Sequence, residues 1–179
     1  MKTVVGLFDD YNAAKSAAVE VERAGVSHND ISVLANNEAE VHGRRDAIDT
    51  HGGMGHAVTK DAGVGAEIGG VLGLLAGLSL FVIPGLGFIA GAGWLAGALT
   101  GAGIGAVAGG LIGALTHVGV PATDAAYYQE GVRRGGTLIA VRAEDANAGN
   151  IAQILNRVGA VNIEERAASY RSEGFVAPL

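Results

Sequence analysis

The segment GWLAGALTGAGIGAVAGGLIG at residues 93–113 has a glycine at every fourth position, and an earlier segment repeats this spacing. On an α-helix, residues four apart lie on one face, so each run predicts a helix with a ridge that lacks side chains. Glycine costs about 1 kcal/mol against alanine in a helix interior, and close approach of two helix backbones is the expected compensation. The predicted helix-packing residues are Gly65, Gly69, Gly73, Gly77, Gly93, Gly97, Gly101, Gly105, Gly109 and Gly113.

The residues around these ridges carry no formal charge. No Asp, Glu, Lys or Arg occurs from Ile68 to Thr123. Pro84-Gly85-Leu86-Gly87 divides the apolar stretch in two, because Pro-Gly pairs mark turns. The sequence therefore predicts a glycine-zipper α-helical hairpin over residues 62–119.

The two arms of this predicted hairpin differ in length. The first arm, Gly65–Ile83, would be about 28 Å long at 1.5 Å per residue, close to the ~30 Å hydrocarbon core of a bilayer. The second arm, Leu86–Val118, is longer, and we expect it to break near Thr100–Gly103. The turn is itself apolar, so a re-entrant hairpin stays open beside a spanning one. Three aromatic residues bracket the turn, and they either lie at a membrane interface or fill the hairpin tip: Phe81, Phe88 and Trp94.

The composition excludes several classes of protein. The chain has 179 residues with 30 glycines and 3 prolines and is 49% hydrophobic, which matches neither collagen nor a Gly/Ser linker. Its net charge is −6 and no Lys/Arg run exceeds two residues, so nucleic acid is not expected as a partner. Without cysteine there is no disulfide, thiol nucleophile or zinc–thiolate site. The amino-terminal residues lack an apolar signal core, which favours a cytosolic start.

The residues on either side of the apolar stretch alternate between strand and helix patterns. Their order is β-α-β before the stretch and α-β-α-β after it. This is the order of a ferredoxin-like split βαβ sheet, in which the second and third strands are antiparallel neighbours. The predicted fold class is α+β, with the helical hairpin inserted between strands 2 and 3. The predicted strands are Thr3–Phe8, Asp30–Ala35, Thr137–Arg142 and Val161–Glu165.

Four regions follow from this pattern. Residues 1–36 and 120–167 are expected to form a discontinuous ferredoxin-like domain. Residues 37–61 form a polar His/Gly linker, residues 62–119 the apolar glycine-rich hairpin, and residues 168–179 a loose tail. Because the ends of the insertion must return to one place, deletion of 62–119 is expected to leave a soluble folded domain.

Five segments carry a family resemblance: TVVGLFDD at 3–10, DISVL at 30–34, IPGLG at 83–87, GVP at 119–121 and YYQEGVRRGG at 127–136. In these segments the chain resembles the bacterial heat-induced general stress proteins of the YflT type. The resemblance covers nearly the whole chain except residues 37–61 and the tail. It implies a stress-linked bacterial protein, and it supplies no catalytic residues.

Two sequence patterns are candidate ligand sites, and each has a plainer explanation. His42, His51, Met54 and His56 include metal-ligand types, but their segment is glycine-rich and also fits a solvated linker. Gly101–Ala106 matches the loose dinucleotide fingerprint GxGxxG/A, which requires a preceding strand. An apolar helix pattern precedes it here, so the match is a by-product of the glycine repeat. No cofactor is therefore predicted.

Polar residues near the ends of the apolar stretch are further candidates. Glu67 is either a functional carboxylate in a membrane or an acid near a helix N-terminus. Tyr127, Tyr128, Arg133 and Arg134 are candidates for an anion or headgroup site. Alternatively, the tyrosines pack on the sheet and the arginines are solvated.

The sequence contains no catalytic motif such as a Ser/His/Asp set, DxD, HExxH or GK[ST], and no enzyme activity is predicted. The first hypothesis is a stress-associated homo-oligomer that is embedded in or bound to the cytoplasmic side of the inner membrane through its glycine zipper, with membrane lipid as a partner. One alternative is a soluble cytoplasmic homo-oligomer with the hairpins as its common core. Another is a small-molecule or metal sensor that uses the α/β domain or the His-rich linker.

Overall fold

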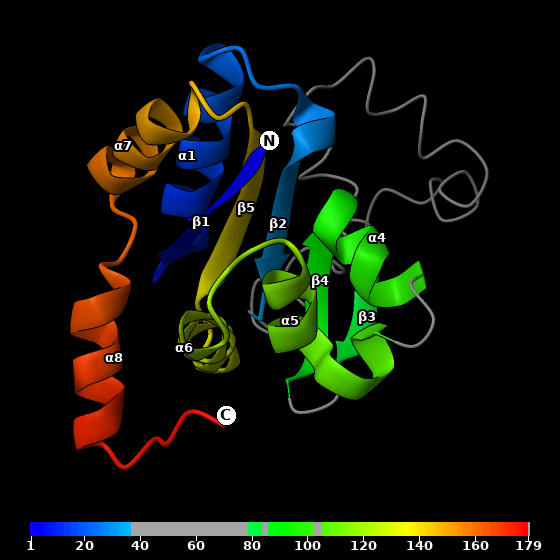
Figure 1. Cartoon of the computed structure of the whole chain (residues 1–179), viewed down its shortest axis with the longest axis vertical. Coiled ribbons are helices and arrows are strands. Elements are labelled where there is room, and N and C mark those ends of the chain that lie inside the picture. Colours follow the sequence, from blue (N-terminus) through cyan, green and yellow to red (C-terminus); the bar gives the residue numbers. More distant parts are fainter. Residues whose placement is uncertain (37–78, 84–85, 102–104, 179) are drawn as a thin grey trace, which may run out of the picture.

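The computed structural model describes residues 1–36, 79–83, 86–101 and 105–178 (Figure 1). These residues form a mixed α+β structure with an antiparallel sheet, which confirms the predicted fold class at that level. In chain order the elements are β1 (Lys2–Phe8), α1 (Tyr11–Arg23), the 3-10 helix η1 (His28–Asp30), β2 (Ile31–Ala35), β3 (Ser79–Ile83), β4 (Gly87–Ala92), α4 (Trp94–Gly101), α5 (Gly105–His117), α6 (Ala122–Arg133), β5 (Thr137–Ala143), α7 (Ala148–Val158) and α8 (Ile163–Ser172).

The described strands form one five-stranded sheet in the order β1-β5-β2-β4-β3. Each neighbouring pair is antiparallel, so β1 and β2 run in the same direction with β5 between them. In the β2–β5 pair, Ile31 lies opposite Val141 and Ala35 opposite Thr137. The predicted antiparallel pairing of the second strand with the strand that begins at Thr137 is confirmed.

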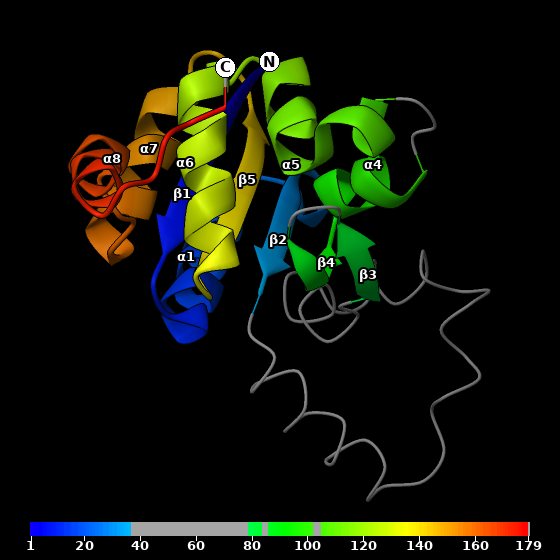
Figure 2. The ribbon, with the colours of Figure 1, turned by 90° about the horizontal axis from the view of Figure 1, so that it is seen from below.

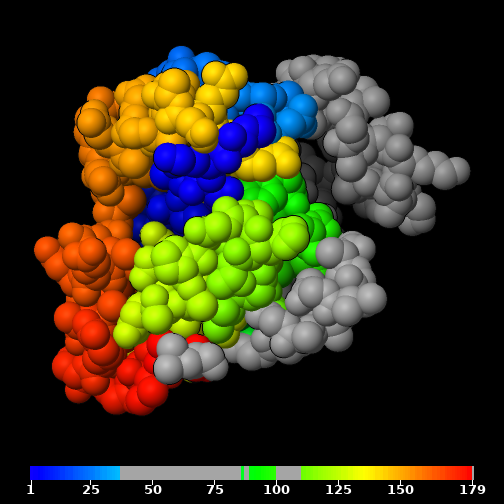
Figure 3. Space-filling model, viewed as in Figure 1, coloured from blue at the N-terminus to red at the C-terminus, as the bar shows by residue number. Residues whose placement is uncertain are grey.

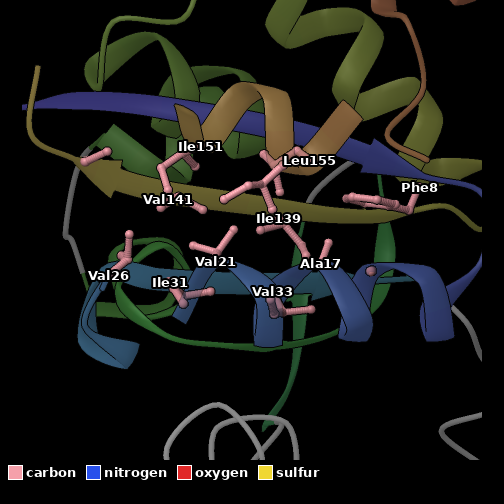
Figure 4. Close-up of a cluster of buried hydrophobic side chains, with 14 of the residues drawn as sticks. Phe8, Ala17, Val21, Val26, Ile31, Val33, Ile139, Val141, Ile151 and Leu155 are labelled. Carbon is pink, nitrogen blue, oxygen red and sulfur yellow. The ribbon is translucent and has the colours of Figure 1, made fainter. Parts of the chain in front are cut away.

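One face of the sheet is covered by α1 and α7. Figure 4 shows Val21 of α1 and Ile151 and Leu155 of α7 pointing toward Ile139 and Val141 of β5. The chain enters α1 as the sequence predicts, because the Asp10 side chain caps the helix by accepting hydrogen bonds from the backbone N–H groups of Asn12 and Ala13. Gly25, which has a φ of 94°, follows the last turn of the helix.

The other face of the sheet is covered by α4, α5 and α6 (Figure 2). Because side chains alternate along a strand, Leu7 points into this second core and Phe8 into the first. Leu34 and Leu138 extend the second core across the middle strands. Both faces of the sheet are thus buried under helices, and the second core depends on the glycine-rich segment. Besides Leu86, which precedes β4, its members from β4 and the helices include Ile89, Leu95, Ala96, Leu111, Leu115, Ala125 and Val132.

The predicted helical hairpin is wrong for residues 79–92. These residues form the strands β3 and β4, and β4 pairs with the edge of β2. Ile83 lies opposite Gly87 in the β3–β4 pair, one on each side of the predicted turn. The reason is that β2 has an unpaired edge that needs backbone partners, and SLFVI at 79–83 and GFIAGA at 87–92 suit strands.

The predicted glycine ridge is wrong at Gly93, which lies in the bend before α4 with a φ of 91°. The helix α4 ends at Gly101 and α5 begins at Gly105, in agreement with the break expected near Thr100–Gly103. Within α5, Gly110 departs from helical geometry, with φ 52° and ψ −141°. Among the residues that the structure describes, no helix is long and apolar enough to cross a membrane.

The predicted fourth strand, Val161–Glu165, is wrong, because α8 begins at Ile163, and α8 also includes the first five residues, 168–172, of the predicted loose tail. The Asn162 side chain accepts hydrogen bonds from the backbone N–H groups of Glu164 and Glu165, and both acids lie in the first turn of the helix. Of the predicted strand, only Val161 bonds to the sheet as a neighbouring strand would. Its backbone N–H donates to the Leu7 carbonyl at 2.7 Å. The cap and the acids favour a helix over a strand at this point.

Candidate functional site

The most concentrated group of charged side chains in the described chain lies at the end of α6. The Glu130 side chain is only 3% exposed and accepts hydrogen bonds from Arg133 Nε and Nη2, both at 2.6 Å, and from Arg134 Nε at 2.7 Å. These bonds, led by the one from Arg133, lower the pKa of Glu130 although burial opposes them. The carboxylate therefore stays charged, and it holds both arginines at the helix end.

The cluster on α6 continues into α8 and the residues after it. Arg134 forms an ion pair with Glu173, and its guanidinium lies 4.2 Å from the centre of the Tyr170 ring. Arg166 of α8 pairs with Asp9 at 2.6 Å, at the junction between β1 and α1. We call these residues, together with Glu130 and Arg133, the α6–α8 cluster. It joins segments that are far apart in the sequence.

The predicted anion site comprises Tyr127, Tyr128, Arg133 and Arg134. In the structure each of these residues contacts a different partner or a carboxylate of its own chain. Tyr127 packs against Phe175, with ring centroids 5.8 Å apart. The Tyr128 hydroxyl donates to the Val5 carbonyl at 3.4 Å. Burial and the nearby charge of Asp124 raise the pKa of Tyr128 to about 12, so the hydroxyl stays protonated as a donor. Because both arginines have carboxylate partners, this geometry favours the packing interpretation.

A second group of contacts attaches the glycine-rich segment to the sheet at Trp94. The indole Nε1–H donates to the Asp30 carbonyl at 3.1 Å, and Arg142 lies 5.0 Å from the ring centre while its Nη2 pairs with the Asp30 carboxylate at 2.8 Å. The Ser32 hydroxyl donates to the Ala92 carbonyl at 2.8 Å. A Cβ on Gly93 would meet the Ile31 carbonyl and approach Ser32 Cα to 2.7 Å. Trp94 therefore anchors the start of α4 to the sheet, and its position at a membrane interface stays a prediction.

The outward side of α4 is apolar and accessible. Leu95 and Ala96 are buried in the second core, whereas Gly97 is exposed and Ala98 and Leu99 are partly exposed. A Cβ built on Gly97 would meet no atom of the described chain within 4 Å. Among the predicted packing glycines whose burial the structure describes, Gly97 is exposed whereas Gly93 and Gly113 are partly buried. The exposed surface at Gly97 leaves room for close approach by another molecule.

Several predicted site residues lie outside the described residues or lack described side chains. Outside them are Gly65, Gly69, Gly73, Gly77, His42, His51, Met54, His56 and Glu67. Phe81 belongs to β3 and Phe88 to β4, and they are not neighbours in the register, because Phe81 lies opposite Ile89. The side chains of these two residues are not described.

The two ligand patterns gain no support from the described elements. The helix α4, not a strand, leads into Gly101 of the dinucleotide-like pattern, so the context that a phosphate-binding turn requires is lacking. Within residues 1–36, 79–83, 86–101 and 105–178, no group of three or more His, Asp or Glu side chains is arranged to hold a metal ion.

Sequence reasoning missed the carboxylates and the tyrosine of the α6–α8 cluster. The spacing of Glu130, Arg133 and Arg134 is a usable signal, because residues three and four apart meet on a helix surface. The contacts of Asp9 with Arg166 and of Arg134 with Glu173 span 157 and 39 residues. No local pattern predicts contacts of that range.

Comparisons of the chain with protein-family models, with curated proteins and with solved structures find no match.

Proposed function

We propose that this protein is a non-enzymatic, stress-associated protein that self-associates through the outward side of α4. The observation that carries the proposal is that α4 buries Leu95 and Ala96 but exposes Gly97 and leaves Ala98 partly exposed. An exposed glycine in a helix lowers helix stability by about 1 kcal/mol relative to alanine. Close packing of a second backbone there would offset that cost. The link to stress rests on the resemblance of the sequence alone.

A second copy of this chain is the proposed partner of this side of α4. The helix WLAGALTG carries no charge along its length, so two copies can approach without burying an unpaired charge. The two α4 helices would meet at their glycines, as the four-residue spacing suggests. This is the soluble homo-oligomer of the sequence hypotheses, now limited to one short helix instead of a long hairpin.

Membrane lipid is the second candidate partner, at the cytoplasmic side of the inner membrane. The absence of Asp, Glu, Lys and Arg from Ile68 to Thr123 favours it. For the described part of that stretch, we propose contact with the bilayer surface rather than a spanning hairpin, because 79–83 and 87–92 pair in the sheet. Flotation with phosphatidylcholine vesicles that contain phosphatidylglycerol tests this candidate.

We further propose that the fold is a variant of the ferredoxin-like plan. Strands β1 and β2 are parallel to each other, are joined by α1, and lie on either side of antiparallel β5. The same arrangement occurs in the ferredoxin-like plan and supports this proposal. In this interpretation the β3–β4 hairpin is added at the edge of β2. The fourth strand of the plan is reduced to the single bond between Val161 and Leu7.

Self-association is tested by light scattering after size exclusion at several concentrations. The variant is Gly97→Leu, and the matched control is Gly149→Leu in α7, an exposed helical glycine where a Cβ also meets no described atom within 4 Å. Both changes improve helix propensity. We expect Gly97→Leu alone to weaken the oligomer by tenfold or more. A wild-type chain that stays monomeric at every concentration and does not float with vesicles contradicts the proposal.

A further inference from the structure

The helix α8 contributes to neither hydrophobic core of the molecule. Its two buried residues, Ala167 and Tyr170, belong to neither set of packed core side chains. Figure 1 shows α8 at the margin of the molecule, and Figure 3 shows the C-terminal residues, orange to red, along that margin. Both cores can therefore remain packed when α8 moves away.

Two ion pairs and a cation–aromatic contact help to hold α8 in place. Arg166 pairs with Asp9, and Arg134 of the α6 end both pairs with Glu173 and lies against the ring of Tyr170. Apolar contacts contribute as well, because Phe175 packs on Tyr127 and Tyr170, and Ala167 and Tyr170 are buried. Ion pairs at a surface weaken as salt is added. A helix of ten residues is not stable without such docking contacts.

The chain before α8 offers a place for the movement to begin. Gly159 ends α7 with a φ of 108°, and residues 160–162 belong to no helix or strand. This connection makes one backbone bond to the sheet, from Val161 N–H to the Leu7 carbonyl at the outer edge of β1. Release of α8 thus needs few backbone hydrogen bonds to break.

We propose that residues 163–175 act as a salt-sensitive strap, which closes over α6 at low ionic strength and opens as a unit while the sheet stays folded. Arg134 is the main contact of the closed strap, because Glu130 holds it in position from α6 and Glu173 engages it from the strap. Opening exposes the Tyr127 side of α6. It also leaves Arg134 and Asp9 without their strap contacts.

The strap is tested by hydrogen exchange, followed by mass spectrometry, on the full chain. Between ~0.01 M and ~1 M salt the Debye length falls from about 30 Å to about 3 Å. We expect the amides of 163–172 to exchange at least tenfold faster at the higher concentration, with α7 and β5 unchanged. Equal exchange of 163–172 at the two concentrations, whether slow or fast, overturns the proposal.

Three variants separate the strap from a general loss of stability. Glu173→Gln removes one ion pair of the strap, and we expect a two- to fivefold rise in α8 exchange, the range for an exposed pair. Glu20→Gln removes the exposed pair with Arg157, which joins α1 to α7, and should leave α8 unchanged. Tyr170→Ala should give fast α8 exchange at both salt concentrations. Equal effects of Glu173→Gln and Glu20→Gln on α8 contradict the strap.

Discussion

Individual residues of this protein take their importance from backbone geometry and from charge pairing. Gly93 illustrates the first, because its φ of 91° and its approach to the β2 backbone exclude a side chain. Glu130 illustrates the second, because a buried carboxylate is stable only with its partners in place. The glycines of the repeat that dominates the sequence are therefore not equally important for the fold.

At the residue scale, we predict that Gly93→Ala destabilises the fold more than Gly119→Ala. Both glycines have left-handed backbones, with φ of 91° and 94°, so each alanine incurs about 1–2 kcal/mol of conformational strain. Only at Gly93 does the new Cβ also clash, since nothing described lies within 4 Å of a Cβ at Gly119. Urea unfolding of both variants measures the difference. Equal losses of stability would show that the contact of Gly93 with β2 is unimportant.

We also predict that Glu130→Gln lowers the free energy of unfolding at pH 7 by about 1–3 kcal/mol, the range for a hydrogen-bonded buried charge. In the folded state the pKa of Glu130 lies below its ordinary value of 4.5. The stabilisation is therefore complete above pH 4.5 and is lost as the pH falls through the lowered pKa. Wild type and Glu130→Gln should thus converge in stability at acid pH. A difference that stays constant from pH 7 to pH 2.5 contradicts this linkage.

At the scale of elements, the periodic segments were predictable and the uniformly apolar ones were not. The helix α1 is amphipathic and capped by Asp10, so its period and its start are both visible in the sequence. The strands β3 and β4 come from apolar runs without a period, which helices and buried strands share. The edge of β2 decides between them by offering backbone hydrogen bonds.

The contribution of the junction between β4 and α4 to stability can be measured through its contacts with the sheet. We predict that Arg142→Met lowers stability by about 1 kcal/mol, because it removes the ion pair with Asp30 and the cation near Trp94. Trp94 is the only tryptophan in the chain, so its fluorescence reports the change directly. Arg157→Met, which breaks an exposed pair with Glu20, is the control and should leave the emission unchanged. Identical effects of the two variants contradict the anchoring role of Arg142.

At the scale of the whole molecule, the glycine-rich segment is part of the core rather than an appendage. Leu34 and Leu138 face Leu95, Leu111 and other side chains of that segment. This arrangement reverses the expectation that deletion of residues 62–119 leaves a folded domain. Removing the segment takes α4 and α5 away from one face of the sheet and leaves α6 there, and buried apolar surface contributes about 25 cal/mol per Å².

We therefore predict that a chain in which Asp61 is joined directly to Val120 unfolds without a cooperative transition or aggregates. The measurement is thermal unfolding followed by circular dichroism, together with size exclusion. A chain truncated after Phe175 provides the control, because Val176 is exposed and residues 176–178 belong to neither core. Cooperative unfolding of the deletion protein as a monomer would restore the view of the segment as a dispensable insertion.

The sequence by itself determined the elements whose pattern has a clear period or boundary signal. These include the strand–helix–strand run from β1 to β2, the helix α6 and the strand β5, together with the antiparallel pairing of β2 with β5. Local periodicity reports which face of an element is buried, and this information lies within a few residues.

Only the tertiary structure decided the fate of the glycine-rich segment and the end of the chain. Regular glycine spacing is compatible with helices, bends and strands alike, because glycine restricts the backbone least. The free edge of β2 provides hydrogen-bond partners for the strands at 79–83 and 87–92, and the otherwise uncovered face of the sheet is covered in part by the short helix at 94–101. Likewise, α8 is positioned by ion pairs of Glu173 with Arg134 and of Arg166 with Asp9, whose partners are remote in sequence. Such contacts depend on the folded chain bringing distant residues together, which no local pattern encodes.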